Sequence, residues 1–420
     1  MSEQKPYFPT LRSITMAQLN LNTIVETTPL QRNNNLSNRY AANVFLKRED
    51  LQVVRSYKIR GAYNKISGLT DEERERGVVC ASAGNHAQGV AYSCQLLGIK
   101  GKIYMPTTTP KQKITQVKMF GKDKIEVVLF GDTYDAASDA AHRDCLETGM
   151  VYIHPFDDPQ IIEGQATAGV EILQDFSGHV DYIFLPIGGG GLAAGVGAYF
   201  KQISPETKII GVEPAGAPSM KTSLEKGEVT PLKDIDKFVD GAAVQRVGDL
   251  TFKVCQQVID DIVTVPEGKV CTTILELYNQ DAIVVEPAGA LAIAALDFYR
   301  DQIEDKNVVC MVSGSNNDIT RTEEIKERSL LYEGLKHYFI VRFPQRAGAL
   351  RDFVDKVLGP NDDITMFEYS KKTNREQGPA LICIELQDKD DFPGLVQRME
   401  ENGFLSEYVN ERPDLFQFLI

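Results

Sequence analysis

Residues 184–200 read FLPIGGGGLAAGVGAYF, in which an apolar strand runs through four glycines into an amphipathic stretch. Consecutive glycines let backbone N–H groups converge on an anion at the start of a helix, where the helix dipole also favours negative charge. A tight turn needs only one or two glycines, and ordering four of them costs considerable conformational entropy. The stretch therefore predicts a phosphate-binding loop formed by Gly188, Gly189, Gly190 and Gly191. No Lys-Ser/Thr pair follows, so a Walker-type nucleotide loop is excluded.

The alternation of strand and helix extends on both sides of this loop, from about residue 40 to residue 318. Short apolar runs such as GVVCAS (77–82) and NVVCMVSGS (307–315) end in small residues, and apolar patterns long enough for helices separate most of them. Continuous apolar strands between helices are typical of parallel sheets that are covered on both faces. We therefore predict an α/β fold for residues 1–320.

The pattern changes after Asp318. A charged stretch follows, which predicts a linking helix within a linker at residues 321–336. Residues 337–420 then show the order β-α-β-β-α-β, which is typical of a small ferredoxin-like domain.

The composition excludes several classes of partner. The 420 residues carry a net charge of −14, with 59 acidic against 45 basic side chains, so neither a nucleic acid nor a membrane surface is expected as a partner. The start of the chain lacks a signal-peptide pattern, and the seven cysteines include no C-x-x-C pair. We expect a cytoplasmic protein without a disulfide framework or a zinc site.

A lysine with unusual neighbours lies in SYKIRGA (56–62), where Lys58 follows Tyr57 and precedes Gly61. Burial beside Tyr57 would lower the pKa of this lysine and supply a neutral amine. Most lone lysines are surface cations, so the argument depends on the other motifs. A phosphate loop and a candidate lysine nucleophile, without a cluster of metal ligands, together suit pyridoxal 5'-phosphate, which carries a phosphate and an aldehyde that forms a Schiff base with lysine.

Two further motifs lie at predicted strand ends. In SAGNHAQG (82–89), Ser82, Asn85 and His86 are placed where α/β sheets bind ligands. Alone, Ser82 or Asn85 could equally cap a helix and His86 could be a half-buried histidine. Glu286 in VEPAGA (285–290) is either an anchor for a ligand loop or a helix cap, and we favour a structural or supporting role.

The motifs together resemble one family. KREDLQVVRSYKIRGA (47–62), ASAGNHAQG (81–89), PIGGGGL (186–192), CMVSGSN (310–316) and TTPL (27–30) are similar in order and character to those of the tryptophan synthase β / threonine dehydratase family of pyridoxal-phosphate enzymes. The resemblance covers roughly residues 15–320. It implies a fold-type II catalytic part with two open α/β subdomains of mostly parallel sheets, the smaller one (roughly 54–150) inserted in the larger. The C-terminal part resembles a single ACT-like regulatory domain.

The resemblance also implies roles for individual residues. Lys58 would hold the cofactor and later move the Cα proton, Asn85 would bind the phenolic oxygen, and Ser313 would face the pyridine nitrogen. A neutral hydroxyl at Ser313 makes the ring a weaker electron sink, which fits elimination better than transamination. Leu192 would join the four glycines around the phosphate. The substrate carboxylate would be held by Ser82, Ala83, Gly84, Asn85 and His86.

The activity that the resemblance implies is conversion of L-threonine to 2-oxobutanoate and ammonia, with weaker action on L-serine, as the first step of isoleucine biosynthesis. Isoleucine or valine would be the effector, with Arg346 and Gly348 of RFPQRAGAL (342–350) at its site, and the assembly would be a homotetramer or homodimer. A hydroxyaspartate ammonia-lyase, a β-replacing synthase and a non-catalytic amino-acid sensor are the alternatives.

Two positions depart from relatives that racemise serine. Ala83 stands where those enzymes carry a second serine that serves as a base, so racemisation is not expected. Glu213 and Ala217 match the divalent-cation site of those enzymes, but Ser219 stands in place of its aspartate. We therefore expect no metal.

Overall fold

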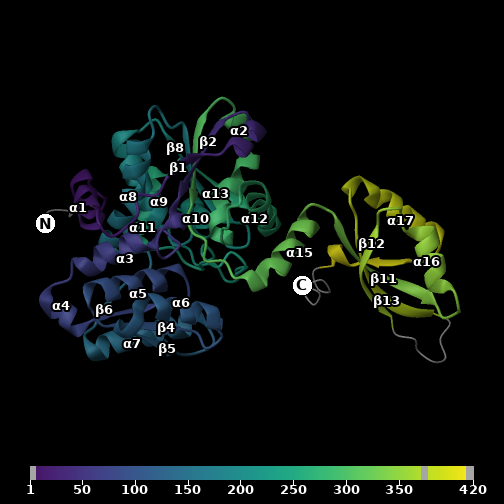
Figure 1. Ribbon diagram of the computed structural model, residues 1–420, viewed down its shortest axis with the longest axis horizontal. Coiled ribbons are helices and arrows are strands. Elements are labelled where there is room, and N and C mark those ends of the chain that lie inside the picture. The colour runs from purple at the N-terminus through teal and green to yellow at the C-terminus, as the bar shows by residue number, and fades with distance from the viewer. Residues whose placement is uncertain (1–5, 370–376, 413–420) are drawn as a thin grey trace. The chain divides into compact units, whose positions relative to one another are not determined.

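The computed structural model describes residues 6–369 and 377–412. The chain divides into two compact units, Met1–Asp318 and Ile319–Ile420 (Figure 1). Within the described residues, every helix falls short of the length or the apolarity that a bilayer span requires.

The first unit is built around a six-stranded sheet with the strand order β1-β2-β10-β7-β8-β9. β1 pairs antiparallel with β2, and the other neighbours are parallel. The strands comprise β1 (Leu30–Arg32), β2 (Asn43–Arg48), β7 (Tyr182–Pro186), β8 (Lys208–Pro214), β9 (Asp261–Val265) and β10 (Asn307–Val312).

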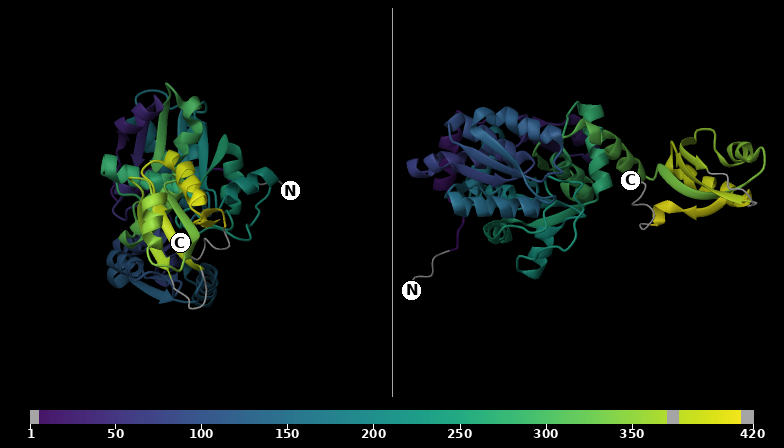
Figure 2. Two further views of the ribbon diagram at one scale, coloured as in Figure 1. Left: turned by 90° about the vertical axis from the view of Figure 1, so that its right-hand side faces the viewer. Right: turned by 90° about the horizontal axis from the view of Figure 1, so that it is seen from below.

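Helices cover both faces of this sheet (Figures 1 and 2). Ile183 and Leu185 of β7 point to one face and belong to the apolar cluster formed with α8, α9 and α11. Phe184 points to the other face because successive strand side chains alternate, and its ring contacts that of Tyr299 at 5.1 Å. The helices of this part are α1 (Leu11–Leu21), α2 (Asn34–Tyr40), α8 (Pro159–Asp175), α9 (Gly191–Ile203), α10 (Ser219–Lys226), α11 (Asp249–Val258), α12 (Glu267–Asp281), α13 (Pro287–Ala294) and α14 (Arg300–Ile303).

A second, four-stranded sheet lies in the same unit and is formed by the chain between β2 and α8 (lower part of Figure 1). Its order is β5-β4-β3-β6, and all of its strands are parallel. The elements are α3 (Lys58–Ser67), α4 (Asp71–Arg76), β3 (Val78–Ala81), α5 (Asn85–Leu97), β4 (Gly101–Met105), α6 (Lys111–Gly121), β5 (Ile125–Leu129), α7 (Tyr134–Thr148) and β6 (Val151–Tyr152). The predicted α/β fold with two mostly parallel sheets is confirmed.

The second unit has an antiparallel sheet with the order β12-β13-β11-β14. Its elements are α15 (Thr322–Tyr332), β11 (Lys336–Pro344), α16 (Ala349–Val357), β12 (Asp363–Tyr369), β13 (Gln377–Glu385), α17 (Phe392–Glu401) and β14 (Leu405–Tyr408). The predicted order β-α-β-β-α-β is confirmed. The part of the predicted final strand region beyond residue 412 lies outside the described residues.

The core of the second unit lies between its sheet and two helices. Phe339 of β11 points to the face that Phe353 of α16 and Leu395 of α17 cover. Tyr338 points to the opposite face, where Leu331 of α15 packs nearby. Since Tyr338 also donates from its hydroxyl to Glu327 of α15 at 2.5 Å, the predicted linking helix is attached to this sheet.

Candidate active site at the carboxyl ends of the parallel strands

Lys58 is placed by contacts between the start of α3 and the end of β10. The backbone N–H of Tyr57 donates to the carbonyl of Ser313 at 3.2 Å, and that of Ser315 donates to the carbonyl of Arg55 at 2.9 Å. Arg55 adopts a left-handed conformation, with φ of 60°, which turns the chain into the helix. The first residue of α3 therefore lies beside the carboxyl end of a central strand, where α/β sheets bind ligands.

The Lys58 amine is half-buried among apolar and backbone groups. Nζ donates to the carbonyl oxygen of Pro155 at 2.8 Å and lies 5.3 Å from the centre of the Tyr57 ring. Burial lowers the pKa of Lys58 to about 8, against an opposing effect of the Glu286 carboxylate. A substantial fraction of the amine is therefore neutral near pH 8 and able to attack a carbonyl carbon.

The glycine loop joins β7 to α9 and presents backbone donors. Within residues 6–369 and 377–412, no group accepts a hydrogen bond from the N–H groups of Gly188 to Leu192. The carbonyl of Gly189 faces away from this row of donors, because it accepts from the Thr251 hydroxyl at 2.6 Å. Unpaired N–H groups at the start of a helix suit the phosphate of pyridoxal phosphate.

Packing explains why side chains are absent from this loop. A Cβ at Gly189 would lie 2.2 Å from Cδ1 of Phe156, and one at Gly188 would lie 3.1 Å from the Cα of Ala242. Gly190 has φ of 94°, in the left-handed region that favours glycine. Side chains at these positions would therefore clash with Phe156 and Ala242, and only glycines allow the loop to present its N–H groups to an anion.

Asn85 begins α5 and is part of a polar network. Its Nδ2 donates to Oε1 of Glu286 at 2.6 Å, and its Oδ1 accepts from Nδ2 of Asn316. The N–H of Asn316 donates to Oε2 of Glu286 at 3.2 Å. Burial, with repulsion from Asp240, raises the pKa of Glu286 to about 7. Glu286 occupies the N-cap position of α13, as the helix-cap alternative predicts, but its side chain makes no capping hydrogen bond there and belongs to the Asn85 network instead.

The other predicted residues lie around these groups. The Ser82 hydroxyl accepts from the N–H of Gly84 at 3.2 Å, and the buried Ser313 hydroxyl donates to the carbonyl of Ala288 at 3.2 Å. His86 is buried with Nε2 2.9 Å from the carbonyl of Ile153, and burial lowers its pKa to about 3. Its neutral ring is thus directed to the backbone, leaving backbone N–H groups of the loop as the candidate carboxylate ligands.

Residues 21–314 match the family described as pyridoxal-phosphate dependent enzyme. The chain belongs to this family. Residues 327–419 of this pyridoxal-phosphate dependent enzyme match the C-terminal regulatory domain of threonine dehydratase.

Individual relatives of this pyridoxal-phosphate dependent enzyme match it over nearly its whole length. The biosynthetic L-threonine dehydratase of Halalkalibacterium halodurans is 58% identical, with 98% of this chain and 99% of the relative covered. That of Bacillus subtilis is 59% identical, with 98% and 97% covered. Among solved structures, processed threonine deaminase isoform 2 of Solanum lycopersicum has a TM-score of 0.72 and 42% identity, and the match covers 77% of this chain and 90% of that one.

Sequence reasoning missed the segment that connects Lys58 to the glycine loop of this enzyme. Residues 154–158 read HPFDD, and Asp158 followed by Pro159 is readable as a helix start. The sequence HPFDD does not indicate that Pro155 contacts the Lys58 amine or that Phe156 contacts the glycine loop. His154 fixes the turn, since its Nδ1 accepts from the N–H groups of Phe156 and Asp157 at 3.2 and 2.7 Å.

The position that corresponds to a cation site in serine-racemising relatives has a different arrangement here. The Glu213 carboxylate accepts from the N–H groups of Met220 and Lys221 at 2.7 and 2.9 Å. Burial raises its pKa to about 7 despite these bonds. Ser219 donates to the carbonyl of Val244. In the described ranges, no group of three His, Cys, Asp or Glu side chains is arranged to hold a metal ion.

The two residues predicted for effector binding lie at the start of α16. Arg346 is exposed and forms an ion pair with Asp352. Gly348 has φ of 85° and occupies the N-cap position of the helix. The left-handed conformation there favours glycine.

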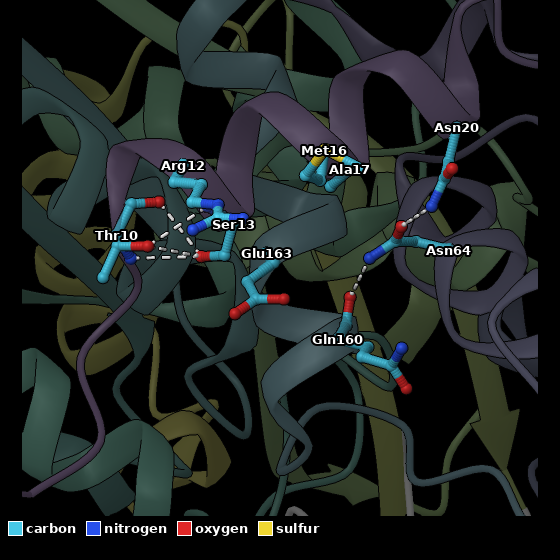
Figure 3. Close-up of a pocket in the computed structure, with 9 residues that line it drawn as sticks. All are labelled: Thr10, Arg12, Ser13, Met16, Ala17, Asn20, Asn64, Gln160 and Glu163. Carbon is cyan, nitrogen blue, oxygen red and sulfur yellow. Dashed lines mark hydrogen bonds between the residues drawn. The ribbon is translucent and has the colours of Figure 1, made fainter.

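A separate pocket of about 300 Å³ lies between α1, α3 and α8 (Figure 3). Asn20 donates to Asn64 at 3.2 Å, and Asn64 donates to the carbonyl of Gln160 at 2.7 Å, which ties the three helices together. None of the predicted site residues lines this pocket, so it is distinct from the candidate active site. Its lining residues are Thr10, Arg12, Ser13, Met16, Ala17, Asn20, Asn64, Gln160 and Glu163.

The lowered pKa of Lys58 gives a testable pH dependence. We expect the rate of pyridoxal phosphate uptake by the apo-protein to rise with pH and to reach half of its maximum near pH 8, because the pKa of Lys58 is about 8 and only the neutral amine attacks the aldehyde. The Glu286 carboxylate raises this pKa, so Glu286→Gln should move the midpoint lower. Stopped-flow absorbance across a pH series measures both. A midpoint at the ordinary lysine pKa of about 10.4 would contradict the expectation.

Proposed function

We propose that this chain is a pyridoxal-phosphate dependent L-threonine dehydratase, which forms 2-oxobutanoate and ammonia and acts more weakly on L-serine. The observation that carries the proposal is the pairing of an amine of lowered pKa with a row of unpaired backbone donors. Lys58 Nζ contacts Pro155, and the next residue, Phe156, packs against Gly189. The full-length similarity to biosynthetic L-threonine dehydratases supports threonine as the substrate, in the first step of isoleucine synthesis.

Pyridoxal phosphate, when bound, supplies an electron sink for the Cα–H bond of the substrate. Lys58 would hold the cofactor aldehyde until the substrate amine displaces it, and the released neutral amine would then remove the Cα proton. The N–H groups of Gly188 to Leu192 bind the phosphate, because the described protein groups leave them unpaired. Asn85 binds the phenolic oxygen in an orientation set by Glu286 and Asn316.

The substrate and the ring nitrogen are held by residues at two strand ends. Backbone N–H groups between Ser82 and His86 bind the substrate carboxylate at the start of α5. Ser313 would face the ring nitrogen with a neutral, rotatable hydroxyl, which in this structure donates to the Ala288 carbonyl. A hydroxyl does not hold the ring nitrogen protonated, so early loss of the β-hydroxyl is favoured over transamination.

The C-terminal unit provides feedback control in this proposal. Its match to the regulatory domain of threonine dehydratase supports effector binding, with isoleucine or valine as the effector and Arg346 and Gly348 at its site. We place the enzyme in the cytoplasm, as a homotetramer or homodimer.

The test is 2-oxobutanoate formation by the purified, cofactor-loaded protein, with and without isoleucine or valine. We expect product from L-threonine, less from L-serine, and inhibition by isoleucine. Product that is indifferent to both effectors would reject the regulatory part and keep the dehydratase. A cofactor-loaded protein that forms no product from threonine or serine would reject the dehydratase and favour a hydroxyaspartate or β-replacement reaction.

A further inference from the structure

Helix α11 has no side chain of its own at its N-cap. The N-cap residue is Gly248, and a Cβ there would lie 2.2 Å from Oδ1 of Asp157. The carboxylate of Asp157, about ninety residues earlier in the chain, instead accepts hydrogen bonds from the N–H groups of Asp249, Leu250 and Thr251 at 3.0, 2.9 and 3.0 Å. Three charge-assisted bonds at a helix start are a strong cap, and the helix dipole adds to them.

The first turn of α11 also holds the glycine loop. The Thr251 hydroxyl donates to the carbonyl of Gly189 at 2.6 Å, and the N–H of Gly248 donates to the same oxygen at 3.3 Å. Thr251 is fully buried, so this contact is not replaced by water. Holding the carbonyl on one side of the loop leaves the N–H groups on the other side for an anion.

The residues just before Asp157 contact both the Lys58 amine and the glycine loop. The carbonyl of Pro155 accepts from Nζ of Lys58 at 2.8 Å. Phe156 packs against Gly189 and against Gly191, where a Cβ would lie 3.0 Å from the Cβ of Phe156. Asp157 therefore links the segment beside the amine to the helix that orients the phosphate loop.

We propose that Asp157 is a positioning residue for pyridoxal phosphate, which sets the spacing between the Lys58 amine and the N–H groups of the glycine loop by capping α11. The inference rests on the proposed cofactor site. Without this cap, Thr251 and the Gly189 carbonyl lose their fixed orientation, and part of the binding energy of the phosphate is spent on ordering the loop.

Asp158 is a matched control. It is the adjacent aspartate and also caps a helix, since its Oδ1 accepts from the N–H groups of Gln160 and Ile161 of α8 at 2.8 and 3.3 Å. Its carboxylate pairs with Lys65 at 2.9 Å. A loss of capping at α8 should lower the thermal stability without acting on the glycine loop.

The test compares the equilibrium dissociation constants of pyridoxal phosphate for apo-proteins of wild type, Asp157→Ala and Asp158→Ala, with thermal unfolding of each. We expect Asp157→Ala to weaken binding by about tenfold or more, and Asp158→Ala to lower the melting temperature comparably while binding the cofactor like wild type. Equal binding by Asp157→Ala and wild type, or equal losses in both variants, would overturn the inference. A wild-type protein that does not bind the cofactor would instead reject the proposed function.

A double-mutant cycle with Thr251→Val tests whether Asp157 affects cofactor binding through α11 and the contact between Thr251 and Gly189. If Asp157 acts through α11, Asp157→Ala should weaken cofactor binding much less in the Thr251→Val background than in wild type. Full additivity of the two losses would show that Asp157 acts by another route and would overturn the proposal.

Discussion

Replacing Lys58 by alanine is expected to lower the rate of 2-oxobutanoate formation by at least about a thousandfold. In the proposed function the change removes both the group that holds the cofactor and the base at Cα, and among the described residues no other amine contacts the Pro155 carbonyl. The measurement is kcat for L-threonine at saturating pyridoxal phosphate. Thermal unfolding of the variant should stay close to that of the wild-type apo-protein, since removing a partly desolvated amine leaves no buried charge behind.

Lys65→Ala is the control for this prediction. Lys65 lies in the same helix and pairs with Asp158 at 2.9 Å, with side chains 19% and 17% exposed. Its loss should change kcat by less than about twofold, because its partner Asp158 caps α8 and is not one of the candidate site residues. A Lys58→Ala enzyme that retained a normal rate would defeat the proposed chemistry.

Replacing Arg60 by methionine is expected to lower the free energy of unfolding by about 3–5 kcal/mol. Arg60 is fully buried and forms two bidentate ion pairs, with Glu49 at 2.7 and 2.7 Å and with Glu171 at 2.7 and 2.8 Å. Lys47 adds a contact to Glu171 at 2.6 Å. The methionine fills part of the space, but the buried carboxylates of Glu49 and Glu171 lose the guanidinium that balances their charge. Urea unfolding of the apo-protein measures the loss.

The unfolding free energy that Arg60→Met loses should become smaller as the pH falls. Burial alone would raise the pKa of Glu49, but Arg60 and Lys47 beside it hold the pKa below its ordinary value. A lowered native pKa stabilises the fold above the ordinary glutamate pKa, and this stabilisation disappears as the pH falls through the native value. The difference between wild type and Arg60→Met should therefore shrink in acid. A difference that grew in acid would contradict the argument.

Arg39→Met provides the comparison for the buried site. Arg39 forms a bidentate pair with Glu276 at 2.8 and 2.9 Å, with both side chains 28% exposed. Its replacement should cost about 1 kcal/mol or less, because solvent screens the pair and hydrates the remaining carboxylate. Equal costs for Arg39→Met and Arg60→Met would show that burial does not set the contribution of the Arg60 network.

Much of the fold could be predicted because its signals are local. Apolar strands alternating with helices indicate parallel sheets, and the switch after Asp318 marks the antiparallel unit, since hydrophobic periodicity reflects which face of each element is buried. The four glycines of the loop were equally readable, because they are consecutive in the sequence, although the contacts with Phe156 and Ala242 that exclude side chains there come from distant segments. The order of the motifs was sufficient to place the chain in its family before any contact was known.

What the tertiary structure decided was the partner of each polar group. SYKIRGA contains both Lys58 and Arg60, yet one is a partly desolvated amine and the other a fully buried ion-pair centre. The difference depends on Pro155 and Glu171, which lie about a hundred residues away and carry no local mark of these roles. Similarly, the cap of α11 is supplied by Asp157 rather than by its own N-cap glycine. Spacing along a chain specifies periodicity, whereas pKa and ion pairing depend on burial and on neighbours that only folding brings within hydrogen-bond distance.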